Sequence, residues 1–315
     1  MDFHVYAIGL KTQFRRITVR EGVVFEGEAG WAEFSPFNDY GNEESAQWWK
    51  SATDSANKAW PEAQRDSIEV NATVPAVSAQ QAFEIVQNSG GCKTIKVKVG
   101  EPGQGLQDDI DRVVAVRDAL GPSGKIRIDV NGGWNVDDAI AAITKLDRAI
   151  GGLEYVEQPV ATIADLARVR KAVNVLIAAD ESIRRVEDPY EVVRADAADI
   201  AVLKVQPLGG VWSALQIAQD IGLPVVVSSA LESSIGLSAG IALAAALPEL
   251  PFACGLATAN LLVGDLVTEP LLPEDGKIQV GRVIPDPTKL QEFAADNETT
   301  ERWLNRITEV QKVGN

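Results

Sequence analysis

Three acidic side chains stand at or near the ends of three consecutive short apolar segments in the middle of the chain. They are Asp129 in the segment 126–131, Glu157 at the end of 153–157, and Asp180 at the end of 176–180. Spacings of 28 and 23 residues each equal one strand–helix unit, so parallel strands would bring these carboxylates to one edge of a sheet. Converging carboxylates repel unless a cation neutralises them, and three oxygen ligands suit Mg²⁺ better than Zn²⁺ or Ca²⁺. The pattern predicts a Mg²⁺ site, although a single acid at such a position more often caps a helix or orients another ligand.

Lysines flank these acids on both sides. In the segment 94–99, Lys96 and Lys98 alternate with apolar residues, so a strand would turn both ammonium groups toward one face. The segment 200–204 ends in Lys204 at the equivalent depth. The order of two lysines, three acids and one lysine around a closed sheet places Lys98 and Lys204 on opposite sides of the metal. A lysine acts as a base near neutral pH only if its pKa is lowered, and the neighbouring ammonium of Lys96 would lower that of Lys98. The alternative is an edge strand with a solvated lysine face.

Composition excludes several other chemistries. The single histidine, His4, cannot supply a Ser-His-Asp triad, a Cys-His pair or a HExxH zinc site, and no GxxxxGK[ST] or GxGxxG phosphate loop is present. The net charge of −16 argues against nucleic-acid binding. Two isolated cysteines, Cys92 and Cys254, indicate a reducing compartment. Without a basic-then-apolar leader, and with its longest apolar stretch (235–247) shorter than a membrane span, the sequence predicts a soluble cytoplasmic protein.

From about residue 67 onward, β-rich runs alternate with segments of helical periodicity. Their spacing is typical of βα units and predicts an α/β fold, a (β/α)₈-type TIM barrel modified at its end, where a turn-rich stretch at 270–287 stands in place of an immediate eighth helix. The eight predicted strands are 68–74, 94–99, 126–130, 153–157, 176–180, 199–204, 224–228 and 252–255, and the predicted helices are 78–87, 106–120, 136–149, 163–173, 214–221 and 235–247.

The first 66 residues have a different pattern. Two antiparallel-type runs, 2–11 and 16–26, precede a predicted helix at 43–59. The segment 300–312 carries an apolar helical stripe that we expect to dock on this N-terminal unit. The predicted domains are therefore an α+β capping domain, residues 1–66 joined by 286–315, and a barrel, residues 67–285.

The site motifs together resemble the enolase superfamily, in its muconate-lactonizing-enzyme-like branch. The matching motifs are TIKVKVG (Lys96, Lys98), IDVNGGW (Asp129, Asn131), VEQP (Glu157), AADES (Asp180) and LKVQPLGG (Lys204). The resemblance covers nearly the whole chain and implies a capped (β/α)₇β barrel. It also implies that Mg²⁺ stabilises an ene-diolate formed when a lysine removes a proton alpha to a carboxylate.

Three loop motifs narrow this resemblance. GWAEFSPF (30–37), SSALESSIG (228–236) and GLATAN (255–260) are similar to those of actinobacterial members that dehydrate 2-succinyl-6-hydroxy-2,4-cyclohexadiene-1-carboxylate to o-succinylbenzoate for menaquinone biosynthesis. The likeness implies Lys98 as the base and then the acid, and Lys204 as an ammonium on the far face. The substrate, a small anionic dicarboxylate, is expected to contact Lys96, Asn131, Gly209, Gly210, Ser228 and Ser229.

Several assignments stay open. Ser228 and Ser229 are also compatible with a local turn, and the two glycines with a tight βα connection. Arg127 contacts either the substrate or a metal-binding acid, Glu181 has a supporting role, and Trp134 and Trp212 are expected to pack.

Rival functions also stay open. They are an N-acylamino-acid racemase, a dipeptide epimerase, a muconate cycloisomerase and a barrel that binds ligand without catalysis. The segment 255–262 lacks the Asp-x-Asp typical of dipeptide epimerases, which disfavours that rival. The sequence predicts no oligomeric state.

Overall fold

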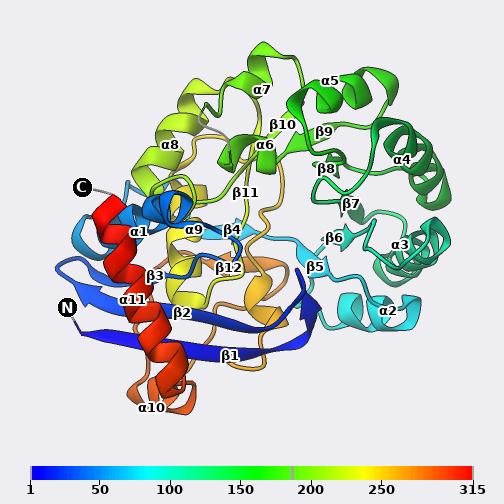
Figure 1. Cartoon of the computed structure of the whole chain (residues 1–315). Helices are drawn as coiled ribbons and strands as arrows, with labels where there is room; N and C mark the ends of the chain where they lie inside the picture. Colours follow the sequence, from blue (N-terminus) through cyan, green and yellow to red (C-terminus); the bar gives the residue numbers. More distant parts are fainter. Residues whose placement is uncertain (1, 186–187, 314–315) are drawn as a thin grey trace.

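A parallel sheet of seven strands forms the centre of the molecule. The computed structural model describes residues 2–185 and 188–313, and the strands follow one another in sequence order around the sheet, from β5 to β11 (Figure 1). Almost every residue of these strands is buried, as expected when helices cover the outside. The strands are β5 (Ala72–Val74), β6 (Thr94–Lys98), β7 (Lys125–Asp129), β8 (Val156–Glu157), β9 (Ile177–Ala179), β10 (Ile200–Leu203) and β11 (Val225–Val227).

The first and the eighth predicted strands have a different arrangement in the structure. The first, 68–74, is divided into β4 (Ser67–Glu69) and β5, because β4 pairs antiparallel with β12 (Lys277–Gln279) below the barrel. The eighth, 252–255, is reduced to two parallel bridges, Val70 with Cys254 and Ser228 with Gly255. The Cys254 amide donates to Glu69 O at 2.8 Å and the Gly255 amide donates to Val227 O at 2.8 Å. These short contacts close the ring between its first and last strands, in the place predicted for strand eight.

Helices pack around the outside of the sheet (Figure 1). Local signals fix their ends: the Asn135 side chain accepts from the Asp138 amide at 2.9 Å, and α4 stops at Gly151, whose φ is 74°. The prediction did not include the one-turn helices α6 and α7. The helices are α2 (Ala79–Gln87), α3 (Leu106–Leu120), α4 (Val136–Ile150), α5 (Ile163–Ala172), α6 (Glu181–Arg184), α7 (Glu191–Arg194), α8 (Val211–Asp220) and α9 (Ser234–Ala246).

The N-terminal unit is a three-stranded antiparallel sheet with a helix. β1 (Phe3–Phe14), β2 (Ile17–Gly27) and β3 (Gly30–Phe34) pair in order, and α1 (Asn42–Asn57) packs on them. α11 (Asn297–Val313) returns to this unit, following α10 (Pro287–Glu292), and its Trp303 ring meets Phe34 edge-on at 5.9 Å (Figure 1). The C-terminal helix therefore docks where its apolar stripe predicts. The domain bounds stay a prediction, and residues 1, 314 and 315 of the proposed cap lie outside the described residues.

Buried polar groups join this cap to the barrel beside the first turn of α9. Glu33 of β3 accepts from the amides of Ser233 at 3.1 Å and Gly236 at 3.2 Å. A second carboxyl, Glu232, is also buried and accepts from the Ala230 amide at 2.7 Å. Burial and the nearby Glu33 raise the pKa of Glu232 to about 7, although Arg20 acts in the opposite direction.

This raised pKa makes stability depend on pH. A carboxyl whose pKa is higher in the folded than in the unfolded chain becomes destabilising as the pH rises from about 5 to about 8. We expect Glu232→Gln to raise the free energy of unfolding at pH 8 by about 3 kcal/mol relative to the natural chain, with little effect at pH 5. Urea denaturation at both pH values checks this prediction, and an equal effect at the two would contradict it.

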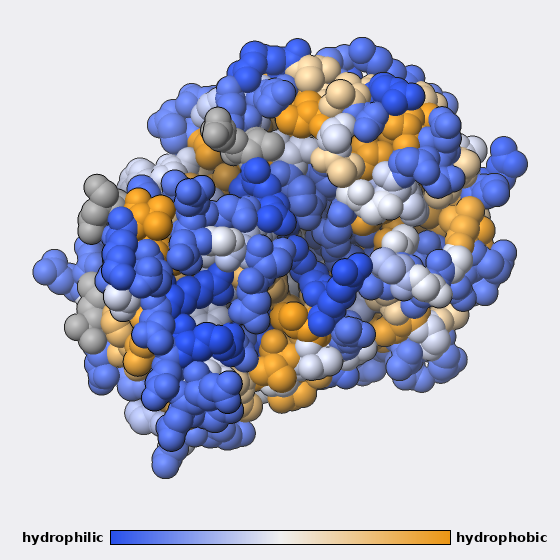
Figure 2. Space-filling view, viewed as in Figure 1, coloured by the Kyte–Doolittle hydropathy of each residue, from blue (hydrophilic) through white to orange (hydrophobic). Residues whose placement is uncertain are grey.

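The face seen in Figure 2 is mainly hydrophilic, with scattered apolar patches. Among residues 2–185 and 188–313, the structure has no helix that combines the length and apolar character needed to cross a membrane.

Candidate active site

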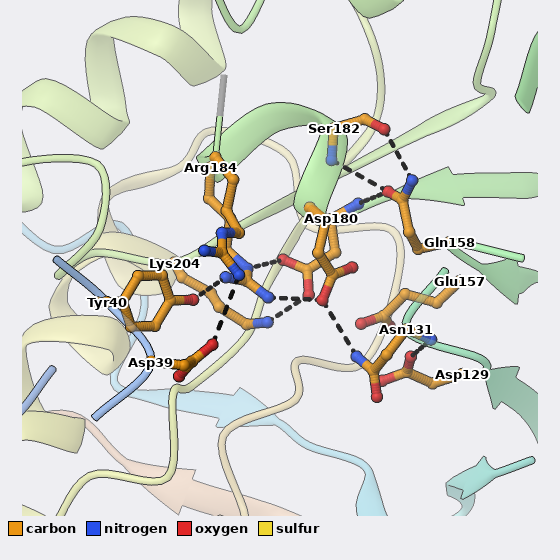
Figure 3. A network of polar contacts seen from close by, with 12 residues as sticks. Asp39, Tyr40, Asp129, Asn131, Glu157, Gln158, Asp180, Ser182, Arg184 and Lys204 are labelled. Atoms are coloured by element: carbon orange, nitrogen blue, oxygen red, sulfur yellow. Dashed lines mark hydrogen bonds and ion pairs between the residues drawn. The ribbon is translucent and has the colours of Figure 1, made fainter. Parts of the chain in front are cut away.

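The three predicted carboxylates lie together at the C-terminal ends of neighbouring strands. Asp129 ends β7 and is paired in register with Glu157, which ends β8, and Asp180 directly follows β9. Their exposed fractions are 2%, 0% and 0%. Figure 3 shows all three extending toward one region, with Lys204 beside Asp180.

Electrostatic repulsion among these acids affects the pKa of the central one, Glu157. Burial, together with the negative charges of Asp129 and Asp180, raises the pKa of Glu157 to about 7, although Lys96 acts in the opposite direction. Burial alone would also raise the pKa of Asp129, but Lys98 and Lys96 outweigh it and hold that pKa well below its usual value. Of the three acids, only Glu157 therefore has a raised pKa, because lysine and arginine side chains offset the negative charge of Asp129 and Asp180.

The two lysines of β6 occupy different environments. Lys96 Nζ lies 3.0 Å from both oxygens of Glu157 and 3.3 Å from Asp129, and these carboxylates raise its pKa despite burial. Lys98 Nζ lies 2.6 Å from Asp129 and also donates to the side chain of Asn131. Burial lowers the pKa of Lys98, and Lys96 lowers it further against the opposing effect of Asp129. Of the pair, Lys98 is the group closer to acting as a base.

The third lysine enters from across the barrel. Lys204 follows β10, which is separated from β6 by β7, β8 and β9 in the sheet. Ile200 and Val202 of β10 belong to the apolar cluster with Tyr155 and Val226, and Lys204 continues the same alternation above them. Its Nζ contacts Asp180, whose other oxygen accepts from Arg184 Nε at 2.8 Å.

A small cavity of about 30 Å³ marks the position where these groups face the cap. Several predicted residues line it, and so do residues from β1, the loop after β3 and the loop after the eighth-strand position. The predicted lining residues are Lys96, Lys98, Asp129, Asn131, Lys204, Ser228 and Ser229, and the others are Phe14, Arg15, Phe37, Thr73, Ala230, Leu231, Gly255 and Thr258.

Gly209 and Gly210 are not brought to this cavity. The Gly209 carbonyl accepts from Lys50 of α1 at 2.8 Å, and a Cβ at Gly209 would lie 2.7 Å from the Gln47 side chain. Gly210 faces Ser51 of the same helix. In the structure these glycines permit close packing of the cap helix on the barrel, so we leave them out of the substrate contacts proposed below.

Two other polar residues have structural partners. Arg127 donates to Tyr155 Oη at 2.9 Å and pairs with Glu154, so it contacts none of the three carboxylates. Glu181 accepts from Asn131 at 3.2 Å and from Arg184 at 2.6 Å, which supports the end of β7. Of the two tryptophans expected to pack, Trp134 is partly buried against the barrel core. Trp212 is half exposed, and its Nε1 donates to Ala59 O at 2.9 Å.

Comparison with known proteins places the chain in a family. Residues 78–286 match the model described as Enolase C-terminal domain-like, and residues 5–56 match Enolase N-terminal domain-like. An o-succinylbenzoate synthase from Thermobifida fusca is 58% identical over 94% of this chain and 92% of its own length. Its counterpart from Mycolicibacterium smegmatis is 52% identical over 96% of this chain and 93% of its own. This chain belongs to the o-succinylbenzoate synthase family of the enolase superfamily.

Solved structures agree with this family's fold. The L-Ala-D/L-Glu epimerase from Bacillus subtilis has a TM-score of 0.77 at 23% identity, covering 90% of this chain and 96% of that one. The muconate lactonizing enzyme from Pseudomonas putida has a TM-score of 0.76 at 22% identity, covering 93% and 98%. The predicted modified barrel with an N-terminal cap is thus confirmed as a fold.

Membership in this o-succinylbenzoate synthase family implies a divalent metal ion, and the donor set fits one. The three buried carboxylates supply only oxygen donors, and their mutual repulsion is relieved by a cation. Within the described residues no three acidic, histidine or cysteine side chains are arranged as a ready metal cluster. Lysine and arginine side chains contact the carboxylate oxygens instead.

The sequence analysis did not predict that residues of the cap line the cavity, or that Gln158 positions the strand ends at the site. Phe14, Arg15 and Phe37 reach the cavity only because the cap docks there, and no local pattern indicates it. Thr73 could have been predicted, because it alternates with apolar residues in the same way as Asn71, so that both polar side chains lie on the inward face of the predicted strand. Gln158, in VEQP, accepts from the amides of Asp180 at 3.0 Å and Ser182 at 3.1 Å, and so fixes the end of β8 to the start of α6 (Figure 3).

Proposed function

We propose that this chain is a carbon–oxygen lyase that dehydrates 2-succinyl-6-hydroxy-2,4-cyclohexadiene-1-carboxylate to o-succinylbenzoate. The observation that carries the proposal is a buried acidic trio, from three adjacent strands, between Lys98 and Lys204 in a chain 58% identical to an o-succinylbenzoate synthase. Asp129, Glu157 and Asp180 would hold Mg²⁺. When bound, this cation supplies positive charge that stabilises the charge developing on the substrate carboxylate.

Lys98 would carry both proton transfers. As the neutral amine, its Nζ takes the proton from the ring carbon that bears the carboxylate. The bond between the neighbouring ring carbon and its hydroxyl then breaks, and the same ammonium returns the proton so that the hydroxyl leaves as water. The lowered pKa of Lys98 supports this role, because the amine must be partly unprotonated near neutral pH.

The other two lysines would act as fixed positive charges. Lys96, whose pKa is raised, would stay protonated and orient the substrate carboxylate. Lys204 would stay an ammonium on the opposite face and attract the electron-rich ring. Asn131 accepts from Lys98 and would hold its amine toward the reacting carbon.

We expect Arg15 to bind the free carboxylate of the succinyl chain. Its guanidinium lies 4.4 Å from the Phe37 ring centroid and lines the cavity near Ser228 and Ser229. Arg15→Gln should raise KM about tenfold with little change in kcat, because the charge contacts a substrate group remote from the chemistry. Steady-state kinetics of product formation checks this. Arg16→Gln is the matched control, since Arg16 shares the left-handed turn but is exposed and does not line the cavity.

The deciding experiment is incubation of the purified chain with the cyclohexadiene substrate, followed by ultraviolet detection of the aromatic product. We expect dehydration with Mg²⁺, none with excess EDTA, and recovery when Mg²⁺ is restored. Failure to form the product in the presence of Mg²⁺ would reject the proposal.

A lysine on each face also suits an N-acylamino-acid racemase, which is the alternative we retain. The same preparation incubated with N-succinylated amino acids in D₂O tests it, because racemisation would incorporate deuterium at the alpha carbon. Dehydration without such exchange would exclude the alternative.

The proposed substrate is thus a small anionic dicarboxylate. The net negative charge of the chain supports a function that does not involve nucleic-acid binding. The two free buried cysteines support a cytoplasmic location, and we propose no membrane partner.

A further inference from the structure

Arg20 of β2 is a buried cation that reaches from the cap into the barrel. It is 2% exposed, and its guanidinium donates mainly to backbone carbonyl oxygens. Nε donates to Leu231 O at 2.9 Å, and Nη2 donates to Ala230 O at 3.3 Å and to Ser35 O. One planar group therefore ties the loop between β11 and α9 to the end of β3.

The loop that Arg20 holds is strained and lines the cavity. Leu231 has a φ of 66°, in the left-handed region that a branched side chain rarely adopts. Such a conformation persists only where the surroundings impose it. Ala230 and Leu231 line the cavity together with Ser228 and Ser229, so the shape of this wall depends on what holds the strained residue.

Arg20 also supports the facing wall. Its guanidinium lies 4.5 Å from the centroid of the Phe37 ring, which lines the same cavity from the cap. Arg20 does not line the cavity itself. Beyond the strained residue, Glu33 binds the amides of Ser233 and Gly236, so the loop is held by the cap at two successive points.

We propose that Arg20 is a positioning residue that fixes the Ser228–Leu231 segment and Phe37 in the arrangement that binds substrate. The inference rests on the proposed function, because it assigns these two walls to the succinyl end of the substrate. Arg20 contacts none of the metal-binding carboxylates or catalytic lysines, so its loss should weaken substrate binding and leave the proton transfers intact.

The first test compares two arginines that donate to backbone carbonyl oxygens at opposite ends of α9, Arg20, which is buried, and Arg65, which is half-buried. We expect Arg20→Met to raise KM about tenfold or more with little change in kcat, because the loop carbonyls lose their donor. Arg65→Met is the matched control: Arg65 donates to Ala244 O at 3.0 Å and Leu247 O at 2.8 Å, at the far end of the helix. It should lower stability without raising KM. An equal rise in KM for both variants, or a fall in kcat alone for Arg20→Met, would overturn the proposal. If Arg20→Met does not fold, Arg20→Lys replaces it, since a lysine keeps the charge but loses the planar fork.

The second test separates backbone positioning from general stability. In the Arg20→Met background, Leu231→Gly and Leu231→Ala both remove the side chain beyond Cβ, but only glycine adopts positive φ freely. We expect the glycine double variant to have about fivefold lower KM than the alanine one. Equal KM values would refute the role assigned to Arg20.

A third measurement distinguishes failure of this inference from failure of the proposed function. Hydrogen exchange of the amides of residues 229–233 should accelerate in Arg20→Met while those of α4 stay unchanged, whether or not the natural chain dehydrates the substrate. Unchanged exchange in the loop would overturn the positioning role by itself. Absence of product from the natural chain would instead reject the proposed function.

Discussion

Lys98→Ala is expected to lower kcat for dehydration by about 10²- to 10⁴-fold, the contribution typical of a positioned acid–base group. The expected loss is large because one amine would act twice, removing the carbon-bound proton and then protonating the leaving hydroxyl. Lys96 cannot replace it, since two carboxylates hold its ammonium and raise its pKa. Product formation under saturating substrate and Mg²⁺ measures the effect.

The fold should survive this change. The Lys98 side chain is at the cavity and 12% exposed, and Asp129 keeps Lys96 as a partner at 3.3 Å. Lys125→Ala is the matched control, because Lys125 begins the neighbouring strand at the opposite end of the barrel and pairs there with Glu154 at 3.1 Å. A Lys98→Ala enzyme with kcat within about tenfold of the natural one would remove Lys98 from the mechanism.

The convergence of the three acids and the lysines could be predicted from the sequence, because it depends on two local patterns. The alternation of Lys96 and Lys98 with apolar residues predicts the face they share, and a spacing of one βα unit between successive acids predicts that they lie at the same edge of the sheet. Neither signal depends on how distant segments pack. Most of the predicted strands were nevertheless longer than the observed ones: β8 includes only two residues of the predicted 153–157.

The cap contacts could not be predicted in this way. Whether Arg15 or Phe37 reaches the cavity depends on the angle at which the cap docks, which is set by buried contacts such as those of Glu33 and Arg20. The same docking turns Gly209 and Gly210 toward α1. A glycine pair after a barrel strand has the same sequence pattern whether it faces a ligand or a helix, so only the packed structure distinguishes the two.

Glu157→Gln is expected to raise the dissociation constant for Mg²⁺ by at least about 100-fold, since it neutralises the central acid of the trio. The prediction follows from position: Glu157 is fully buried on the strand between those that deliver Asp129 and Asp180. Mg²⁺ should raise the melting temperature of the natural chain and have little effect on the variant, which calorimetry measures without any assay of activity.

The same substitution should have the opposite effect on the metal-free protein. Because the folded-state pKa of Glu157 is raised to about 7, its ionised form is destabilising above that pH, and a neutral amide removes this effect. We therefore expect metal-free Glu157→Gln to be the more stable protein at pH 8, with the difference vanishing near pH 4. Glu154→Gln is the control, because Glu154 lies three residues earlier in the chain and pairs with Arg127. This variant should be less stable than the natural chain but should still bind Mg²⁺. A cation-binding role requires that the Glu157 carboxylate destabilise the metal-free protein and be needed for Mg²⁺ binding. If Glu157 served only as a structural ion pair with Lys96, the variant would be less stable than the natural chain at pH 8.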